Sequence, residues 1–313
     1  MTHASVYEGG LPEGTGVLPY DTAGFFGYVS TDGRLLLREE RLFGVAMDSE
    51  RYVSFQSVPS ELVVRDPRNS VTKSIEFGGY PFLLDGRLFL ISTNRAGIAE
   101  LVDGETPGWK REYASVITDL DSRKGVLALG LLDSRVQIVD ASGAVTLELN
   151  MKGSRINAVY GCALSEDASR VAVIHGIDRQ YVSILNILGG AAEITDYPLR
   201  QEFRTTRYLR FFGSDRFLVI ERDNGLNMLD LDNNAEYYIP AKGSLVDAGE
   251  LHKHNLIWAL FDDGKFSELI IIDPPERVLV RSALTSGAAA FSQGGQIALA
   301  IGEMLCIAEE EIR

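Results

Sequence analysis

Short apolar runs of five to eight residues recur along nearly the whole chain, and turn residues separate them. Each run is rich in Val, Ile, Leu and aromatic residues and is short enough to form one β-strand. RVQIVDA, RVAVIHG and LIWALFD are examples. The dipeptides between the runs tolerate the positive φ angles of tight hairpin turns; they include Asp32-Gly33, Asp85-Gly86, Asp103-Gly104, Asn224-Gly225 and Asp263-Gly264. This pattern predicts an all-β protein. The best helical candidate is LRQEFRTTRYLRFF at 199–212.

One strand type with a bulky first residue returns at intervals of 36 to 46 residues. A second apolar strand follows it, often closed by an Asp, and then a strand in which polar residues alternate with apolar ones. Adding the strand before each bulky start gives four strands in roughly 40 residues, which is the period of a β-propeller blade. Seven such sets predict a single seven-bladed β-propeller of four-stranded blades. The bulky starts are near Tyr52, Leu88, Val126, Val171, Phe217, Leu256 and Ile297.

The two ends of the chain must complete the last blade, because an open sheet edge would otherwise remain. After Ala290 there is room for three strands only, so we expect the N-terminus to supply the fourth. Residues 25–40 contain it, and we favour RLLLRE as the single closing strand; in the alternative, both outer strands come from 25–40. An eight-bladed ring is disfavoured because residues 1–24 are too few for two more strands. The predicted organisation is a flexible Gly/Pro-rich lead-in at 1–24 and the propeller at 25–313.

The repeat resembles the WD-repeat-like seven-bladed propellers over roughly residues 25–310. The Asp that ends VQIVD, ELVVRD and LIIID stands in a similar place to the Asp of those repeats. The chain departs from their pattern in having no Gly-His pair and no Trp-Asp at a strand end. The resemblance implies the fold, and a fold does not by itself imply a function.

Charge narrows the classes of partner. The chain carries 30 Lys and Arg against 44 Asp and Glu, a formal net charge of −14. This acidity argues against duplex nucleic acid and against an anionic membrane surface as main partners. No apolar stretch is long enough to insert into a bilayer as a helix. The chain as it stands would be cytoplasmic; a periplasmic or envelope-tethered protein is the alternative if an N-terminal segment was removed. We expect a monomeric ring.

Cysteine and histidine give weak signals. Cys162 and Cys306 lie in apolar runs, which predicts buried free thiols, with a disulfide between them as the alternative. His175 ends an apolar strand and is interpreted as a core or rim residue. His252 and His254 flank Lys253, and on a strand this spacing would place both rings on one face, as a metal site requires. A solvated loop is the simpler interpretation.

Acidic residues form two further patterns. Asp230, Asp232, Asn234 and Glu236 alternate like the start of a calcium loop, but Ala235 and Ala241 occupy the positions of the required Gly and Glu. We therefore interpret this segment as a polar turn. Asp119 and Asp121 would begin an inner strand and could point into a central channel, where paired carboxylates can hold a metal or transfer protons.

The main basic cluster lies between the fourth and fifth predicted blades. Arg200, Arg204, Arg207 and Arg210 fall within eleven residues. Tyr208 and three Phe residues are interleaved with them. Arg with aromatic residues is typical of protein interfaces and also stacks on single-stranded bases. We predict that Arg200, Arg204, Arg207, Tyr208 and Arg210 bind a partner protein; the alternative is that these Arg side chains pair with nearby carboxylates.

The predicted function is therefore a non-enzymatic scaffold for protein–protein interaction. No common catalytic, nucleotide-binding or zinc motif is present, and no cofactor is predicted. The first alternative is an enzyme or ligand sensor with a metal or acid–base site in the channel, using Asp119, Asp121 or Glu166. The second is an exported propeller tethered to the cell envelope.

Overall fold

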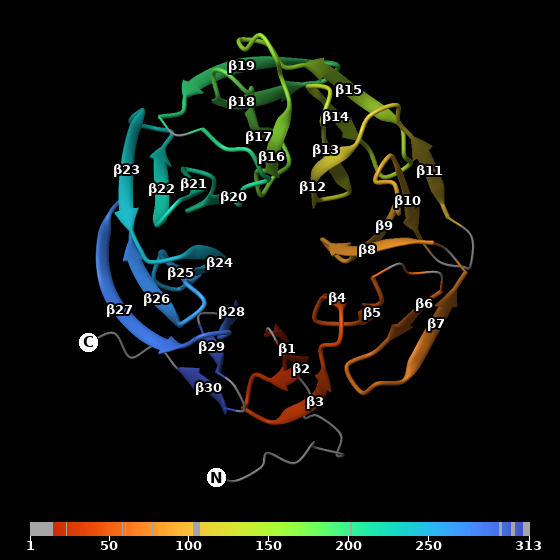
Figure 1. Cartoon of the computed structure of the whole chain (residues 1–313), viewed down its shortest axis with the longest axis vertical. Helices are drawn as coiled ribbons and strands as arrows, with labels where there is room; N and C mark the ends of the chain where they lie inside the picture. Colours follow the sequence, from red (N-terminus) through yellow and green to blue (C-terminus); the bar gives the residue numbers. More distant parts are fainter. Residues whose placement is uncertain are drawn as a thin grey trace. The chain divides into compact units, whose positions relative to one another are not determined.

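The computed structural model describes residues 15–22, 24–57, 59, 61–76, 78–102, 107–200, 202–293, 296–301 and 304–308. Within these residues the secondary structure is β-strand, with no helix, which confirms the all-β expectation (Figure 1). None of the described segments includes a helix able to cross a membrane. The chain divides into two compact units. The first unit contains residues 1–77 and 223–313, and the second contains residues 78–222.

The second unit contains three four-stranded antiparallel sheets and a hairpin, each formed from consecutive strands. The first sheet has β8 (Gly79–Leu84), β9 (Arg87–Ser92), β10 (Gly97–Leu101) and β11 (Trp109–Glu112). The next has β12 (Ile117–Arg123), β13 (Val126–Leu131), β14 (Arg135–Val139) and β15 (Val145–Asn150). The third has β16 (Val159–Leu164), β17 (Arg170–His175), β18 (Tyr181–Leu188) and β19 (Ala191–Pro198). The hairpin is β20 (Leu209–Phe212) and β21 (Phe217–Arg222).

The first unit contains two four-stranded sheets, two three-stranded sheets and a hairpin. Its three-stranded sheets are β1 (Val17–Asp21), β2 (Phe25–Ser30) and β3 (Leu35–Glu40), and β28 (Ala289–Gln293), β29 (Gln296–Ile301) and β30 (Met304–Ala308). Its four-stranded sheets are β4 (Gly44–Met47), β5 (Tyr52–Phe55), β6 (Leu62–Arg65) and β7 (Val71–Ile75), and β24 (Ser244–Leu251), β25 (Leu256–Asp262), β26 (Phe266–Asp273) and β27 (Arg277–Thr285). The hairpin is β22 (Gly225–Asp230) and β23 (Ala235–Pro240).

Strand position within a sheet sets its burial. β13 and β14 are buried on both faces except at their first residues, which explains their nearly continuous apolar sequences. The fourth strands β15, β19 and β27 expose most or alternate side chains, as predicted for outer strands. The strands of all seven predicted blades are found at the predicted positions along the chain, the last with three described strands.

Neighbouring sheets pack face to face through apolar side chains. In the second unit, Phe89 and Ile98 of one sheet pack with Leu127 and Leu129 of the next. Ala128 and Val136 continue the core towards Val159, Cys162 and Val173 of the third sheet. These contacts bury large aliphatic surfaces, and burial of this kind is the main stabilising contribution in an all-β protein of this size.

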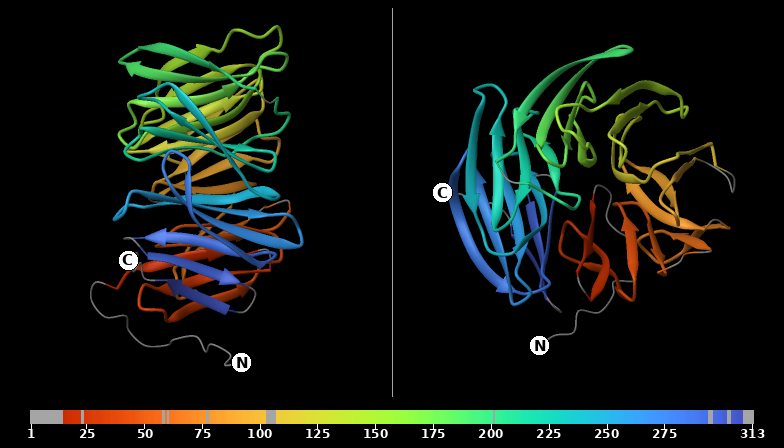
Figure 2. Two further views of the ribbon diagram at one scale, coloured as in Figure 1. Left: turned by 90° about the vertical axis from the view of Figure 1, so that its left-hand side faces the viewer. Right: turned by 45° about the horizontal axis from the view of Figure 1, so that its top comes forward.

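In the first unit, the N-terminal sheet packs directly against the C-terminal sheet. Leu18 of β1 and Val29 of β2 contact Ala298 of β29, and all three side chains are buried. On its other face the N-terminal sheet packs against β4–β7 through Phe26, Tyr28 and Tyr52. Figure 2 shows the first sheet in red beside the last sheet in dark blue. The chain therefore closes by packing one whole sheet on another.

This arrangement corrects the predicted closure. RLLLRE forms β3, but β3 pairs with β2 and not with the last blade. Residues 17–21, predicted as part of the lead-in, form β1 and complete an additional three-stranded sheet. Pro19 was a linker signal in the sequence, yet β1 is an edge strand, where the missing N–H of proline is tolerated. Two strands are recognisable in the sequence of residues 25–40. The additional sheet was missed because the third strand, β1, lies in residues assigned to the lead-in.

The segment 199–212, the best helical candidate of the sequence, forms no helix in its described residues, in keeping with the all-β prediction. Residues 202–208 are irregular and 209–212 form β20. The side chain of Gln180, which is buried, holds this segment instead: its amide donates to the Phe203 carbonyl over 2.7 Å and accepts from the Phe203 N–H. The alternating β-forming residues favour this extended path.

Candidate partner-binding face

Six connections between strands meet at one end of the second unit. They are 93–96, 113–116, 132–134, 151–158, 176–180 and 199–208, and we call them the basic loop face. Every second connection of an antiparallel meander lies at the same end of its sheet, which explains why these six gather.

Backbone hydrogen bonds join the connections one to the next. Ile117 donates to Arg95, Leu132 to Val116 and Met151 to Ser134, at 2.8–3.0 Å. Ile177 donates to Ile156 at 3.0 Å and Leu199 to Gln180 at 2.9 Å. The face is therefore continuous and is held by its own backbone.

The two ends of the second unit carry opposite charge. The basic loop face has seven Arg and Lys residues against three Asp and Glu. The described connections at the other end are 85–86, 124–125, 140–144, 165–169, 189–190 and 213–216, and we call them the acidic loop face. They carry five acidic residues against Lys124 and Arg216. The basic loop face is therefore opposite in sign to the net charge of −14 on the whole chain.

The predicted arginine cluster divides into exposed and structural members. Arg204 is exposed; it donates to the Ile177 carbonyl at 2.9 Å and pairs with Glu202 at 2.7 Å. Arg207 is largely buried: its guanidinium lies 3.3 Å from Glu221 and 4.9 Å from the centre of the Phe203 ring. Tyr208 donates its backbone N–H to the same Glu221 carboxylate over 3.1 Å.

The remaining members lie at the two ends of the connection. Arg200 is exposed just after β19, and Arg210 lies in β20, half-buried, with its guanidinium 5.9 Å from the Phe212 ring centre. The expected alternative, pairing with carboxylates, therefore applies to Arg204 and Arg207. The exposed members of the cluster are Arg200 and Arg204.

Sequence reasoning missed most of the exposed basic residues on this face. Arg95, Lys152, Arg155 and Arg179 are all exposed, and they come from four different connections. Arg155 pairs with Asp178 at 3.0 Å, whereas Lys152 and Arg179 have no carboxylate partner among the described residues. Alternate connections between the predicted strands lie at the same end of the blades. Assigning each connection to an end in this way would have placed these four residues together.

Exposed aliphatic side chains accompany these charges. The exposed fraction is 62% for Ile156, 49% for Leu132 and 36% for Val116. Apolar residues surrounded by Arg are typical of interface centres, where the apolar group is desolvated and the charges lie at the rim. The basic loop face thus carries exposed apolar side chains among exposed basic ones.

Asp119 and Asp121 serve the packing of the second unit. The Asp119 carboxylate accepts the Cys162 N–H over 2.8 Å, and the Asp121 carboxylate accepts the Leu164 N–H over 2.8 Å. The pair thereby joins β12 to the neighbouring strand β16. Burial raises the pKa of Asp119 to about 7, although the backbone hydrogen bonds from Cys162 and Leu120 act to lower it.

These contacts do not favour the predicted channel site. Glu166, its third candidate residue, lies exposed in the turn between β16 and β17. No group of three or more His, Cys, Asp or Glu residues that could hold a metal occurs within the described ranges.

The histidine and cysteine candidates have simple environments. His252 and His254 lie in the turn between β24 and β25, not on a strand, and His252 is 3.2 Å from Glu250. His175 is fully buried, bonds Ser183 at 2.7 Å, and has its pKa lowered to about 4 by burial. Cys162 is a buried free thiol, as predicted. The side chain of Cys306 is outside the described part of the chain.

The calcium-like segment is a polar turn, as interpreted. Asp230 is buried, and its carboxylate accepts the N–H groups of Asp232 and Asn233 at 3.1 and 3.3 Å. The amide of Asn233 donates to the same carboxylate over 2.8 Å. Asp230 is therefore used in closing the turn.

Comparison with known proteins places this chain in an all-β family. A family model described as "beta-propeller protein" matches residues 3–308. A relative in Treponema pallidum (strain Nichols), an uncharacterized protein, is 22% identical over 232 residues, which are 74% of this chain and 62% of that protein. The match therefore spans about three fifths of the relative's length.

Solved structures share the fold at low sequence identity. Hsv2 of Kluyvelomyces marxianus is 11% identical with a TM-score of 0.61, over 85% of this chain and 94% of that one. AztD of Citrobacter koseri is 9% identical with a TM-score of 0.65, over 95% and 93%. The computationally designed Ika8 protein is 10% identical with a TM-score of 0.65, over 95% and 96%. At these identities the likeness extends to the fold alone.

Proposed function

Because the chain belongs to the β-propeller proteins, we propose that it is a scaffold that binds an acidic protein segment on the basic loop face of its second unit. The observation that carries this proposal is the reversal of charge between the two ends of that unit. A uniformly acidic surface would need no such separation to keep the protein soluble.

The geometry supports a rigid binding surface. The six connections are joined by backbone hydrogen bonds, so little conformational entropy is lost when a partner binds. Ile156 and Leu132 offer apolar contact area, and Lys152, Arg179 and Arg204 offer charged donors around it. An acidic segment with apolar side chains would satisfy both.

The test is a charge reversal at exposed positions without carboxylate partners. The double variant Lys152→Glu with Arg179→Glu changes the net charge by four and leaves the core untouched. The matched control is Lys110→Glu with Lys124→Glu, which makes the same charge change at exposed positions away from the basic loop face. Affinity capture from lysate of the source organism, with quantitative mass spectrometry, measures the partners that each protein retains.

We expect the captured amount of a partner that wild type and control retain to fall about tenfold or more with the Lys152/Arg179 variant. The introduced Glu side chains repel an acidic partner, because like charges across an interface slow association and weaken binding. The retained partner should carry an acidic segment and bind more weakly as salt rises. Equal loss in variant and control, or no loss in either, would contradict the proposal. Capture of single-stranded nucleic acid in place of a protein would contradict it as well.

A further inference from the structure

The N-terminal sheet of the first unit has one strand fewer than its neighbour. Sheet β1–β3 ends at β3, whereas the sheet packed against it continues through four strands from β4 to β7. β3 pairs with β2 along one edge, and no strand of the described residues pairs with its other edge. A free edge presents unpaired N–H and C=O groups that can bind another strand.

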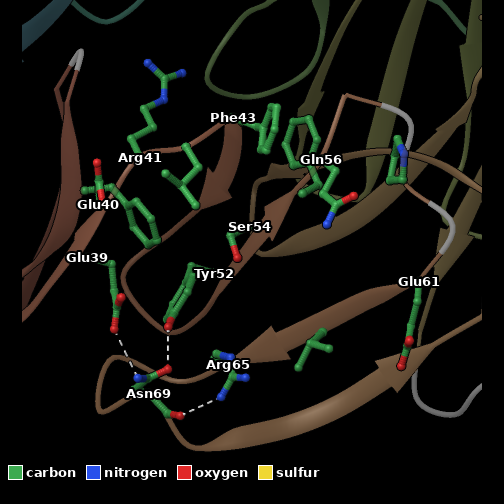
Figure 3. A pocket seen from close by; sticks show the side chains of 16 residues that line it. Glu39, Glu40, Arg41, Phe43, Tyr52, Ser54, Gln56, Glu61, Arg65 and Asn69 are labelled. Carbon is green, nitrogen blue, oxygen red and sulfur yellow. Dashed lines mark hydrogen bonds between the residues drawn. The ribbon is translucent and has the colours of Figure 1, made fainter.

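A cavity lies beside the last two residues of β3. A groove of about 620 Å³ lies between the end of β3 and the face of β5 and β6. Glu39, Glu40 and Phe43 come from the β3 side, and Ser54, Glu61 and Arg65 from the opposite side (Figure 3). We call this site the β3 groove.

Exposure along β5 and β6 shows that no described element fully covers this face. The second and third strands β13 and β14 are buried at every position after the first. In β5 and β6, by contrast, Ser54 is exposed and Val63 and Arg65 are only partly buried. Ser54 pairs with Val63 across the two strands, so the uncovered residues share one face. Of the described residues of β5 and β6, Tyr52 at the start of β5 packs in the apolar cluster of the N-terminal sheet.

Apolar residues line the entrance of the groove. The exposed fraction is 72% for Leu42 and 56% for Phe43, among the highest of the large apolar residues described. Inside, the Phe55 ring lies on the backbone of Gly44, where a Cβ atom would approach the ring to 2.2 Å. The groove therefore has apolar residues at its entrance and the Phe55 ring inside.

The charges available within the groove are carboxylates. Glu40 has no partner among the described residues, and it lies on the wall opposite Glu61 (Figure 3). Arg65 donates to the Asn69 carbonyl at 3.0 Å, and Arg41 pairs with Asp21 at 3.2 Å, so the basic groups are engaged. Glu39 accepts the Asn69 amide at 3.2 Å and keeps its second oxygen for another donor.

We propose that the β3 groove binds an extended segment of a partner protein as a fourth strand on β3, with basic side chains on Glu39, Glu40 and Glu61 and apolar side chains on Phe43 and Phe55. The free edge supplies main-chain hydrogen bonds, and the two walls supply the side-chain specificity, as in other cases of strand addition. Basic and apolar residues both fit, because neighbouring residues of a strand point to opposite sides and each wall carries a carboxylate and a phenyl ring. This site is independent of the basic loop face and lies in the other unit.

The probe is a fluorescein-labelled peptide containing Lys-Val-Lys-Val-Lys-Val. Its binding to the whole chain is measured by fluorescence anisotropy. Two control peptides carry Glu in place of Lys, or Pro in place of the central Lys. We expect binding of the Lys peptide and at least a tenfold loss for both controls, because Glu repels the carboxylates and Pro removes a backbone donor. Equal binding of all three peptides would overturn the proposal.

Variants locate the binding. Ser54→Trp fills the groove at an exposed position, and we expect it to abolish peptide binding while far-ultraviolet circular dichroism stays unchanged. Phe266→Ala, at an exposed position of the first unit outside the groove, is the control and should bind like wild type. Binding that survives Ser54→Trp would place the peptide elsewhere and overturn the proposal.

Hydrogen exchange separates strand addition from simple side-chain binding. The bound peptide should slow exchange of amides in residues 35–40, which form β3, and leave β27 unaffected. Binding without protection of β3 would overturn the strand geometry. A concentration-dependent dimer that Ser54→Trp abolishes would show that a second copy, not a partner peptide, occupies the groove.

Discussion

At the scale of single residues, identical side chains have different roles according to what the fold brings to them. Arg204 and Arg207 are three positions apart in one connection, and the sequence gives them equal weight. Glu221 of β21 and the Phe203 ring take Arg207 into the interior, while Arg204 stays at the surface. A charge reversal at Arg207 would therefore test folding, and only the exposed positions test binding.

Asp119 gives a prediction about pH. Its pKa is raised to about 7 in the folded protein and is about 4 in an unfolded chain, so folding favours the neutral form. The contribution of Asp119 to the free energy of unfolding is then constant below pH 4, falls as the pH rises from 4 to 7, and is constant again above pH 7. Asp119→Asn keeps an acceptor for the Cys162 N–H and removes this dependence. Urea unfolding at several pH values measures this difference. Between pH 4 and 8, the free energy of unfolding of the variant should rise relative to that of wild type by up to about 4 kcal/mol.

The control for this prediction is a carboxylate of opposite behaviour. Asp140 lies in a turn, where hydrogen bonds from Ser142 and Ala144 lower its pKa. Its contribution to stability is present above its unfolded pKa and is lost as the pH falls, so Asp140→Asn should be less stable than wild type at neutral pH. If Asp119→Asn followed the same direction as Asp140→Asn, the assignment of Asp119 as a group that prefers the neutral form would be wrong.

At the scale of elements, the sheet β8–β11 contains a buried ion pair. Glu100 accepts two hydrogen bonds from Arg87, at 2.7 and 2.6 Å, and a third from the Trp109 indole at 2.6 Å. The side chains of Arg87 and Glu100 are 12% and 7% exposed. This cluster joins three consecutive strands of one sheet.

Removing one partner of this pair should be costly. Glu100→Ala leaves the Arg87 guanidinium buried without its counter-charge, and we expect a loss of about 3–5 kcal/mol in the free energy of unfolding. The control is Asp133→Ala, which breaks the surface pair with Arg135 at 2.8 Å and should cost no more than about 1 kcal/mol. Chemical denaturation of both variants measures the difference. Equal losses would mean that the buried geometry of Glu100 contributes nothing beyond a surface pair.

The positions of the strands can be predicted closely from the local sequence. Which strands lie beside one another can be predicted less well. Strand positions are readable because β13 and β14 are apolar throughout and β15 alternates, a difference set by burial on two faces or one. The face that each connection occupies follows from alternation, so Arg155 and Arg179 could have been grouped with Arg204. The β3 groove could not be predicted, since it depends on which strand lies beside β3, and no local pattern records that.

At the scale of the whole molecule, closure depends on contacts between the two ends of the chain. Leu18 and Ala298 are 280 positions apart, yet both are buried in one cluster with Val29. Local propensity does not encode such a contact. The Pro19 residue next to Leu18 also argues against a strand at this place in the sequence. The prediction of a closing strand identified the correct segment and the wrong manner of closure.

A double-mutant cycle tests this packing directly. Leu18→Ala removes a buried side chain and should cost about 2–5 kcal/mol. Ala298→Leu inserts extra volume at a fully buried position and should cost about 1–3 kcal/mol. If the two side chains share one space, the double variant restores much of the lost volume, and its cost should be smaller than the sum of the single costs by about 0.5–3 kcal/mol. Strict additivity, measured by chemical denaturation, would show that the first and last sheets do not pack through these residues.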